Sequence, residues 1–291
     1  MREFIFVVGS TASGKSEWAL REAAQNSGVI FNCDSIQLYQ DVNIGSAKPS
    51  KEDREKVPHY LFDIIPPPQE ITSGDYRDLF LSEVKKIPSS VPIYVVGGTG
   101  FYFLALEKGL YEIEEASNDL KLEIEKQAGS KEGLQRLMDE IQNRDPEYAQ
   151  KLHLHDQYRI IRAVEILRSN PSKTITQLAA EKKQARGLDG SIRKVGIRWS
   201  PSDLENRIRQ RTKKMLEEGL IEETDQLLKR GFEGWAPLRS VGYKEVAQYI
   251  NGEIPRGQLE EQIVISTRQL AKKQRTWFQR DPEIEWLSFS K

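Results

Sequence analysis

The chain of 291 residues has one cysteine, three histidines and no long hydrophobic run. A single cysteine, Cys33, excludes an internal disulfide bond and fits a reducing compartment. No apolar stretch approaches the roughly 20 residues that a membrane-spanning helix needs, and the first residues do not form a signal-peptide pattern. We therefore expect a soluble, cytoplasmic protein with no membrane partner.

The chain also lacks an excess of charge of either sign. Lysine and arginine number 43 and aspartate and glutamate 44, which gives a net charge of -1. A nucleic-acid surface therefore requires local segregation of charge. Residues 262–280 contain no acid, and their cations are Arg268, Lys272, Lys273, Arg275 and Arg280. Arg268, Lys272 and Arg275 recur at helical spacing, so they predict one basic helix face. Trp277 and Phe278 follow, either to stack on a base or to anchor the helix in the core.

Short apolar runs indicate the fold class. They predict buried strands at residues 4–8, 29–31, 61–65 and 92–96. Helices are expected between them at 16–25 and 72–86, the second beginning at the cap pair Thr72 and Asp75. Strands that alternate with helices favour a parallel α/β sheet.

The pattern changes after residue 111. Helical periodicity without a convincing strand runs from 117 to 184, a strand is expected at 194–199, and the last third is helical with a final strand at 284–287. We therefore predict an α/β fold, a P-loop NTPase-like parallel sheet core with a helical insertion domain. The core comprises residues 1–112 plus 192–291, and the insertion comprises residues 113–191.

Residues 9–16, GSTASGKS, match the phosphate-loop pattern G-x-x-x-x-G-K-[ST] at every position. The segment follows a predicted strand and opens a predicted helix, which is the context that the motif requires. Backbone amides at a helix N-terminus bind anions. The residues expected to hold a diphosphate are Gly9, Thr11, Ala12, Ser13, Gly14, Lys15 and Ser16. The Ser16 hydroxyl is the candidate Mg²⁺ ligand, and the plain alternative is a glycine-rich turn with an exposed lysine.

Phosphate binding leaves the reaction open. ATPases and kinases usually carry an acid at the end of a sheet strand. The strand expected at 93–96 is followed instead by Gly97, Gly98 and Thr99. Asp34, just after the second strand, is the best-placed acid, and Asp63 is a weaker candidate. This departure from the layout of ATPases and kinases favours another reaction in which a diphosphate takes part.

Seven motifs together resemble the tRNA dimethylallyltransferase family. They are GSTASGKS (9–16), DSIQLY (34–39), GGTGFY (97–102), DQYRIIRA (156–163), RIRQR (207–211), SVGYK (240–244) and RTW (275–277). They follow the family's order over nearly the whole chain. Ser10 stands where the family often has proline. Larger eukaryotic members carry a C-terminal zinc finger, which one cysteine and three histidines cannot supply, so the chain resembles the bacterial type.

The resemblance implies transfer of a dimethylallyl group from dimethylallyl diphosphate to N6 of adenosine 37 beside the tRNA anticodon. It implies Asp34 as the general base, although Asp34 could instead cap the turn with Ser35 or hold Mg²⁺. Thr99 is expected to contact the reacting region or the diphosphate. Arg211 is implied as a second phosphate-binding cation, whereas spacing alone would favour a solvated basic face.

The same resemblance implies a tRNA surface. The adenosine must leave its stack to react, and the amide of Gln37 carries a donor and an acceptor to read it. The helical insertion is expected to contact the anticodon stem-loop. The implied tRNA-binding residues are Asp34, Ser35, Ile36, Gln37, Gly100, Gln157, Arg159, Arg162, Arg239, Gly242, Lys244, Lys272 and Arg275. We expect a monomer.

Three alternatives compete with this interpretation. One is a P-loop kinase acting on a nucleotide, which should bind and turn over a nucleoside triphosphate. Another is a prenyltransferase acting on a free adenine nucleotide, against which the helical insertion and the basic segment argue. The third is a non-catalytic RNA-binding nucleotide switch, in which Asp34 and Gln37 would have no required role.

Overall fold

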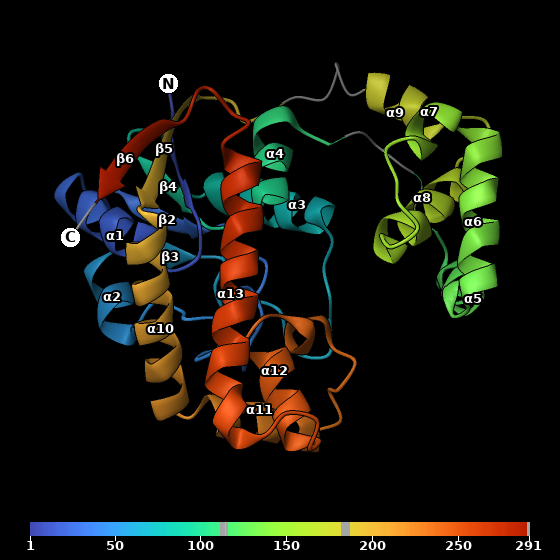
Figure 1. Ribbon diagram of the computed structural model, residues 1–291. Helices are drawn as coiled ribbons and strands as arrows, with labels where there is room; N and C mark the ends of the chain where they lie inside the picture. The colour runs from blue at the N-terminus through green and yellow to red at the C-terminus, as the bar shows by residue number, and fades with distance from the viewer. Residues whose placement is uncertain (111–113, 115, 182–186, 290–291) are drawn as a thin grey trace. The chain divides into compact units, whose positions relative to one another are not determined.

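The computed structural model describes residues 1–291 except 111–113, 115, 182–186 and 290–291 (Figure 1). The chain divides into two compact units. Met1–Glu107 and Leu188–Lys291 form the first, which we call the sheet unit, and Lys108–Gly187 form the second, the helical unit. The divisions lie a few residues before the expected bounds of 113 and 191. None of the described helices combines the length and apolar composition needed to cross a membrane.

The sheet unit contains six strands in the order β3-β2-β4-β1-β5-β6. Their bounds are β1 Glu3–Gly9, β2 Val29–Asn32, β3 His59–Tyr60, β4 Ile93–Val96, β5 Ser191–Trp199 and β6 Glu285–Phe289. Every neighbouring pair is parallel. The structure therefore confirms the α/β, P-loop NTPase-like core.

The strand expected at 61–65 is wrong. The edge strand β3 lies just before it, and only Ile65 makes an isolated bridge, to Tyr39. Leu61 and Asp63 have φ angles of 63° and 56°, which extended backbone does not allow. Asp63 is instead held in a turn by ion pairs with Lys48 and Arg54, so polar contacts override the apolar pattern here.

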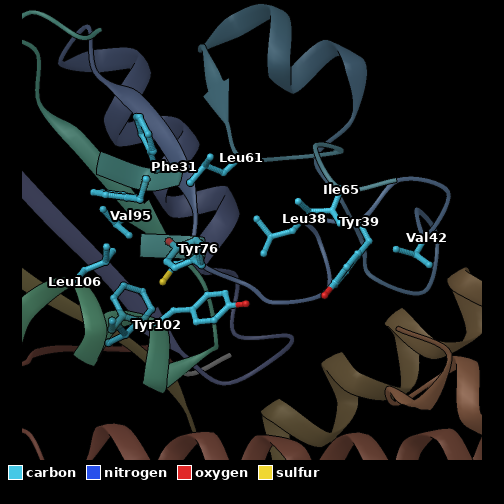
Figure 2. Close-up of a cluster of buried hydrophobic side chains, with 14 of the residues drawn as sticks. Phe31, Leu38, Tyr39, Val42, Leu61, Ile65, Tyr76, Val95, Tyr102 and Leu106 are labelled. Atoms are coloured by element: carbon cyan, nitrogen blue, oxygen red, sulfur yellow. The ribbon is translucent and has the colours of Figure 1, made fainter. Parts of the chain in front are cut away.

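Alternating side chains of β1 divide the core of the sheet unit into two layers. Phe4, Phe6 and Val8 belong to the larger cluster, whereas Ile5 and Val7 belong to a second one. The larger cluster includes buried residues of α3 (Ser73–Val84), α4 (Gly100–Lys108) and α13 (Arg256–Phe278), and the second includes buried residues of α1 (Lys15–Gln25). Helices therefore cover both faces of the sheet, as a parallel sheet requires. Figure 2 shows part of the larger cluster, where Tyr76 of α3 stacks on Tyr102 of α4.

The remaining elements of the sheet unit are mostly C-terminal helices. They are α2 Lys51–Lys56, α10 Pro201–Glu217, α11 Leu220–Lys229, the 3₁₀ helix η2 Ala236–Arg239 and α12 Tyr243–Ile250. The long helix α13 packs on α10 and on α12 (Figure 1). The expected cap pair is confirmed, because the Thr72 hydroxyl accepts from Asp75 N and the Asp75 carboxylate accepts from Thr72 N. The packing of α13 on α10 lies beside the phosphate loop, because buried Ile208, Val264 and Ala271 of these helices contact Ala12 of the loop.

The helical unit has a core of its own. Its helices are α5 Asn118–Ala128, α6 Lys131–Arg144, α7 Pro146–Ala149, α8 Gln157–Ser169 and α9 Ile175–Glu181. They bury Ile124, Ile141, Ile160 and Val164 in one cluster. The structure assigns no strand to the described part of this unit, as the periodicity predicted. The last expected helical residues, 182–184, lie outside the described residues.

Candidate active site

Three motifs meet at the carboxyl edge of the sheet because their strands are neighbours. In the register, Val96 of β4 lies opposite both Val7 of β1 and Asn32 of β2. The phosphate loop, Asp34 and Thr99 each follow one of these strands. Thr99 links two motifs, since its Oγ1 accepts a hydrogen bond of 3.0 Å from Ser35 N. This is the edge where parallel α/β sheets bind ligands.

The phosphate loop turns sharply into α1. Gly14 has a φ of 83°, a left-handed conformation that glycine adopts without steric cost, and the helix begins at Lys15. The Lys15 ammonium donates to Ser10 O at 3.3 Å. Burial lowers the pKa of Lys15 to about 8; the Asp34 carboxylate opposes this shift and Arg211 adds to it. The lysine, the carboxylate and the arginine are therefore within electrostatic reach of one another.

Arg207 and Trp199 support the loop from outside. The Arg207 Nε donates to Ala12 O at 2.8 Å, and the Trp199 Nε1 donates to Ser13 O at 2.8 Å. The guanidinium lies 4.5 Å from the centre of the tryptophan ring, a favourable cation–π distance. The sequence analysis missed both supports. The four-residue spacing of Arg207 and Arg211 was the available signal, because it puts them on one helix face.

Gln274 of α13 also holds the loop, and it had not been singled out. Its Oε1 accepts from Thr11 N at 2.7 Å, and its Nε2 donates to Gly98 O at 3.1 Å. One side chain thus joins the phosphate loop to the segment after β4. No local pattern marks this glutamine, because its partners lie 263 and 176 residues away.

Arg211 does not lie on a solvated basic face. Its Nη1 donates to Thr11 Oγ1 at 3.1 Å. Burial lowers the pKa of its guanidinium, and Asp34 acts in the opposite direction. On the same helix Lys213 and Lys214 are exposed, and Arg209 is paired with Glu205 and Glu261.

Asp34 is oriented by its own turn. Its Oδ1 accepts from Ile36 N at 3.0 Å, and its backbone N–H donates to the side chain of buried Asn32 at 2.9 Å. The turn therefore uses only one of the two carboxylate oxygens. Within the described residues, Oδ2 of Asp34 has no hydrogen bond. One oxygen fixes the carboxylate and the other remains available to accept a proton.

Gln37 retains only half of its expected hydrogen-bonding capacity. Its Nε2 donates to Ser46 O at 2.9 Å and to Ala47 O at 3.1 Å. The amide nitrogen is thereby occupied, and Oε1 is left as an acceptor. The expectation that Gln37 offers both a donor and an acceptor is therefore corrected to an acceptor alone.

The expected basic face of α13 is smaller than the spacing suggested. Lys272 and Arg275 are exposed and form no ion pair among the described residues. Arg268 is paired with Glu205 of α10 at 3.3 Å. The two aromatic residues separate, since Phe278 is buried in the core whereas Trp277 is 41% exposed. A surface groove of about 450 Å³ is lined by Gln269, Lys272, Lys273, Thr276, Trp277 and Arg280.

The other expected tRNA contacts fall into two groups. In the sheet unit, Ser35 and Ile36 are half-buried beside Asp34, and Gly100 packs against the Trp277 ring. Arg239 pairs with Glu70 at 3.7 Å. Gly242 is buried, whereas Lys244 is exposed. In the helical unit, Gln157 donates to Ala128 O at 3.3 Å. Arg159 pairs with Asp156 at 3.6 Å and Arg162 with Glu165 at 2.7 Å. These arginines already neutralise local acids.

Comparison with known proteins matches these features to one family. A family profile described as IPP transferase matches residues 37–281. A tRNA dimethylallyltransferase of Bdellovibrio bacteriovorus is 50% identical over 287 residues, which is 98% of this chain and 93% of the relative. The tRNA dimethylallyltransferase 2 of Geotalea uraniireducens is 37% identical over 99% of this chain and 92% of its own. The chain belongs to the IPP transferase family.

Solved structures agree with this assignment. A tRNA isopentenylpyrophosphate transferase of Bacillus halodurans is 29% identical with a TM-score of 0.71, over 99% of this chain and 90% of that one. A eukaryotic dimethylallyltransferase, described as acting on tRNA, is 22% identical with a TM-score of 0.80 over 99% of this chain and 74% of that one, and shares the fold.

Proposed function

We propose that this IPP transferase moves a dimethylallyl group from dimethylallyl diphosphate to N6 of adenosine 37 in a tRNA. One observation carries the proposal: a phosphate loop with two half-buried cations, Lys15 and Arg211, lies within electrostatic reach of the Asp34 carboxylate. The cations suit a diphosphate, and the carboxylate suits a nucleophile that must lose a proton.

The residues divide the reaction between a leaving group and a nucleophile. The C–O bond from the allylic carbon to diphosphate breaks, and negative charge grows on the diphosphate. Loop amides, Lys15 and Arg211 are positioned to stabilise that charge. The N6 lone pair forms the new C–N bond, and the proton that N6 loses passes to Asp34. Prenylated adenosine and diphosphate leave, and no nucleoside triphosphate is consumed.

Thr99 is assigned to the reacting region. It follows β4 and bonds to Ser35, the residue next to the proposed base; besides accepting from Ser35 N, its hydroxyl lies 3.3 Å from Ser35 Oγ. A hydroxyl in this place can contact either the departing diphosphate or the N6 amine. Its bond to Ser35 also holds the turn that carries Asp34 beside the end of β4.

The tRNA surface is assigned to the exposed cations and to the acceptor of Gln37. Oε1 of Gln37 is suited to accept from the N6 amino group of a flipped adenine. Exposed Trp277 lines the same groove as Lys272 and Lys273 and offers a stacking face near phosphate-binding charge. The helical unit is proposed to contact the anticodon stem-loop. A tRNA substrate also suits the cytoplasmic location expected from the sequence, and the monomeric state stays a prediction.

The donor set around the loop fits Mg²⁺ bound mainly by substrate. Among the described residues, no group of three or more His, Cys, Asp or Glu side chains could hold a metal ion. Mg²⁺ at a phosphate site needs only one or two protein ligands, since phosphate oxygens and waters supply the rest. The exposed Ser16 hydroxyl at the start of α1 is suited to be that ligand. When bound, the ion neutralises charge on the diphosphate.

A direct assay separates this function from the alternatives. The protein is incubated with dimethylallyl diphosphate and bulk tRNA without nucleoside triphosphate, and the digested nucleosides are analysed by mass spectrometry. We expect adenosine heavier by one dimethylallyl group in the tRNA, and no product with free adenine nucleotides. Robust tRNA-stimulated ATP hydrolysis without prenylated adenosine would support the kinase or the switch instead.

A further inference from the structure

Glu223 of α11 binds a loop that lies far from it in sequence. Its carboxylate accepts hydrogen bonds of 3.0 Å from Asn43 N and from Ile44 N, and one of 3.3 Å from Gly45 N. Three consecutive backbone amides thus converge on one side chain. Such charge-assisted bonds are the stronger class of protein hydrogen bond, so Glu223 fixes the backbone of this loop.

Tyr243 of α12 completes the attachment. It is fully buried, and its hydroxyl donates to Glu223 and accepts from Gly45 N at 3.1 Å. Gly45 lies so close to the tyrosine ring that any side chain at this position would collide with it. Burial and the neighbouring Glu223 carboxylate raise the pKa of Tyr243 well above its ordinary value, so the phenol keeps its proton to donate.

The attached loop in turn holds Gln37. The amide nitrogen of Gln37 donates to the carbonyls of Ser46 and Ala47, the next two residues after Gly45. The Ser46 hydroxyl ties the same segment back to Val42 O at 2.6 Å. Hydrogen bonds and the short backbone segment between them therefore connect Glu223 to the Gln37 amide. The two carbonyls of this segment determine which end of that amide is left as an acceptor.

We infer that Glu223 and Tyr243 are positioning residues for base recognition, and that they act through Gln37. The inference rests on the proposed function. An acceptor at Oε1 accepts from the 6-amino group of adenine, whereas the 6-oxo group of guanine presents another acceptor. A site built around one buried hydrogen bond rejects a ligand that leaves its group unpaired. Holding the Gln37 amide in one orientation therefore selects adenine over guanine.

The test measures base preference rather than activity alone. Anticodon stem-loops that differ only in adenosine or guanosine at position 37 are titrated against wild type, Glu223→Gln and Tyr243→Phe. Glu223→Gln turns an amide donor toward the loop N–H groups, and Tyr243→Phe removes the hydroxyl while keeping the ring. We expect both variants to reduce the adenosine preference by a factor of about 5–30, the effect of one or two hydrogen bonds. The KM for dimethylallyl diphosphate should not change.

Matched controls lie on the same helices. Glu222→Gln changes the neighbouring acid, which is exposed and makes no hydrogen bond to this loop among the described residues. Tyr249→Phe removes a hydroxyl at the other end of α12, away from the loop. Both should keep the wild-type preference. Unchanged preference in Glu223→Gln and Tyr243→Phe overturns the inference, as does an equal loss of binding to both stem-loops.

A double-mutant cycle tests whether the two residues act through Gln37. In a Gln37→Ala background, Glu223→Gln and Tyr243→Phe should cause no further loss of adenosine preference, because their route to the base is gone. Additive losses would show that they act elsewhere and overturn the inference. A wild-type protein that neither prefers adenosine nor prenylates it refutes the proposed function itself, whereas failure of the variants alone refutes only the positioning role.

Discussion

At the scale of single residues, the site depends on two cations, Lys15 and Arg211, whose charged forms are disfavoured by partial burial. Lys15 and Arg211 both have lowered pKa values, chiefly because of burial, and the Asp34 carboxylate is the group that opposes both shifts. Arg211 repels the Lys15 ammonium, and this repulsion adds to the lowering of the Lys15 pKa. A diphosphate relieves that repulsion, so the loop is prepared for an anionic ligand.

The pKa of Lys15 leads to a pH-dependent donor affinity. In the free protein the ammonium is protonated below about pH 8 and loses its charge above it. A bound diphosphate favours the charged form, so binding takes up a proton above pH 8. We expect the affinity for inorganic diphosphate, measured by calorimetry, to fall by up to about tenfold per pH unit above 8. Lys15→Arg keeps its charge across this range and should remove most of that slope; an unchanged slope would exclude Lys15 as its source.

Asp34→Asn should stop chemistry while sparing binding. Asparagine keeps a side-chain oxygen for Ile36 N, so the turn survives, but it cannot accept the N6 proton. We expect the single-turnover rate with tRNA to fall by about a hundredfold to ten-thousandfold, with tRNA affinity mostly kept. Asp41→Asn is the control, an exposed acid paired with Arg230. A rate near wild type for Asp34→Asn would remove this carboxylate from the mechanism.

At the scale of elements, α13 performs three tasks along one helix. Phe278 anchors it in the core, Gln274 holds the phosphate loop, and Lys272 and Arg275 face solvent. Residues one or two apart on a helix point in different directions. The same short segment can therefore support the donor site and present charge to RNA.

The exposed cations of α13 should control the salt dependence of tRNA binding. We expect Lys272→Ala plus Arg275→Ala to weaken binding and to lower the log–log salt slope, by somewhat under one unit for each lost phosphate contact. Diphosphate binding should change much less. Arg268→Ala is the matched control on the same helix, because Arg268 is already paired with Glu205. If affinity and slope in the double variant equal those of wild type, this face is not part of the RNA site.

At the scale of the whole molecule, the two units have separate cores. The helical unit buries its own aliphatic cluster around Ile160, which is 0% exposed. The phosphate loop, Asp34 and Gln37 all belong to the sheet unit. A substitution in the core of the helical unit should therefore affect tRNA binding without affecting binding of the diphosphate donor.

Ile160→Ala should reveal that separation. A buried isoleucine reduced to alanine costs about 2–5 kcal/mol of folding free energy, and the loss should fall on the helical unit. We expect a lower unfolding temperature and weaker tRNA binding, with unchanged affinity for inorganic diphosphate by calorimetry. Leu122→Ala, in the same unit but 64% exposed, should leave all three near wild type. A parallel loss of diphosphate affinity in Ile160→Ala would show that the units do not fold independently.

Local patterns were enough for much of this protein. The phosphate loop, the Thr72 cap and the helical nature of the insertion depend on residues close together in the chain, so motif and periodicity identify them. The place of Asp34 just after a predicted strand also indicated the ligand-binding edge of a parallel sheet, whereas its contact with the Thr99 segment depended on the strand order.

Only the tertiary structure decided the contacts that join the site to residues far away in the sequence. The supports of the phosphate loop come from Arg207 and Gln274, and the attachment of the Gln37 loop comes from Glu223; each acts on residues more than 170 positions away. Whether Arg268 is available to RNA depends on an acid of α10. A side chain is a free charge, an ion-pair partner or a structural hydrogen-bond donor according to the groups that folding brings beside it, and sequence spacing does not contain that information.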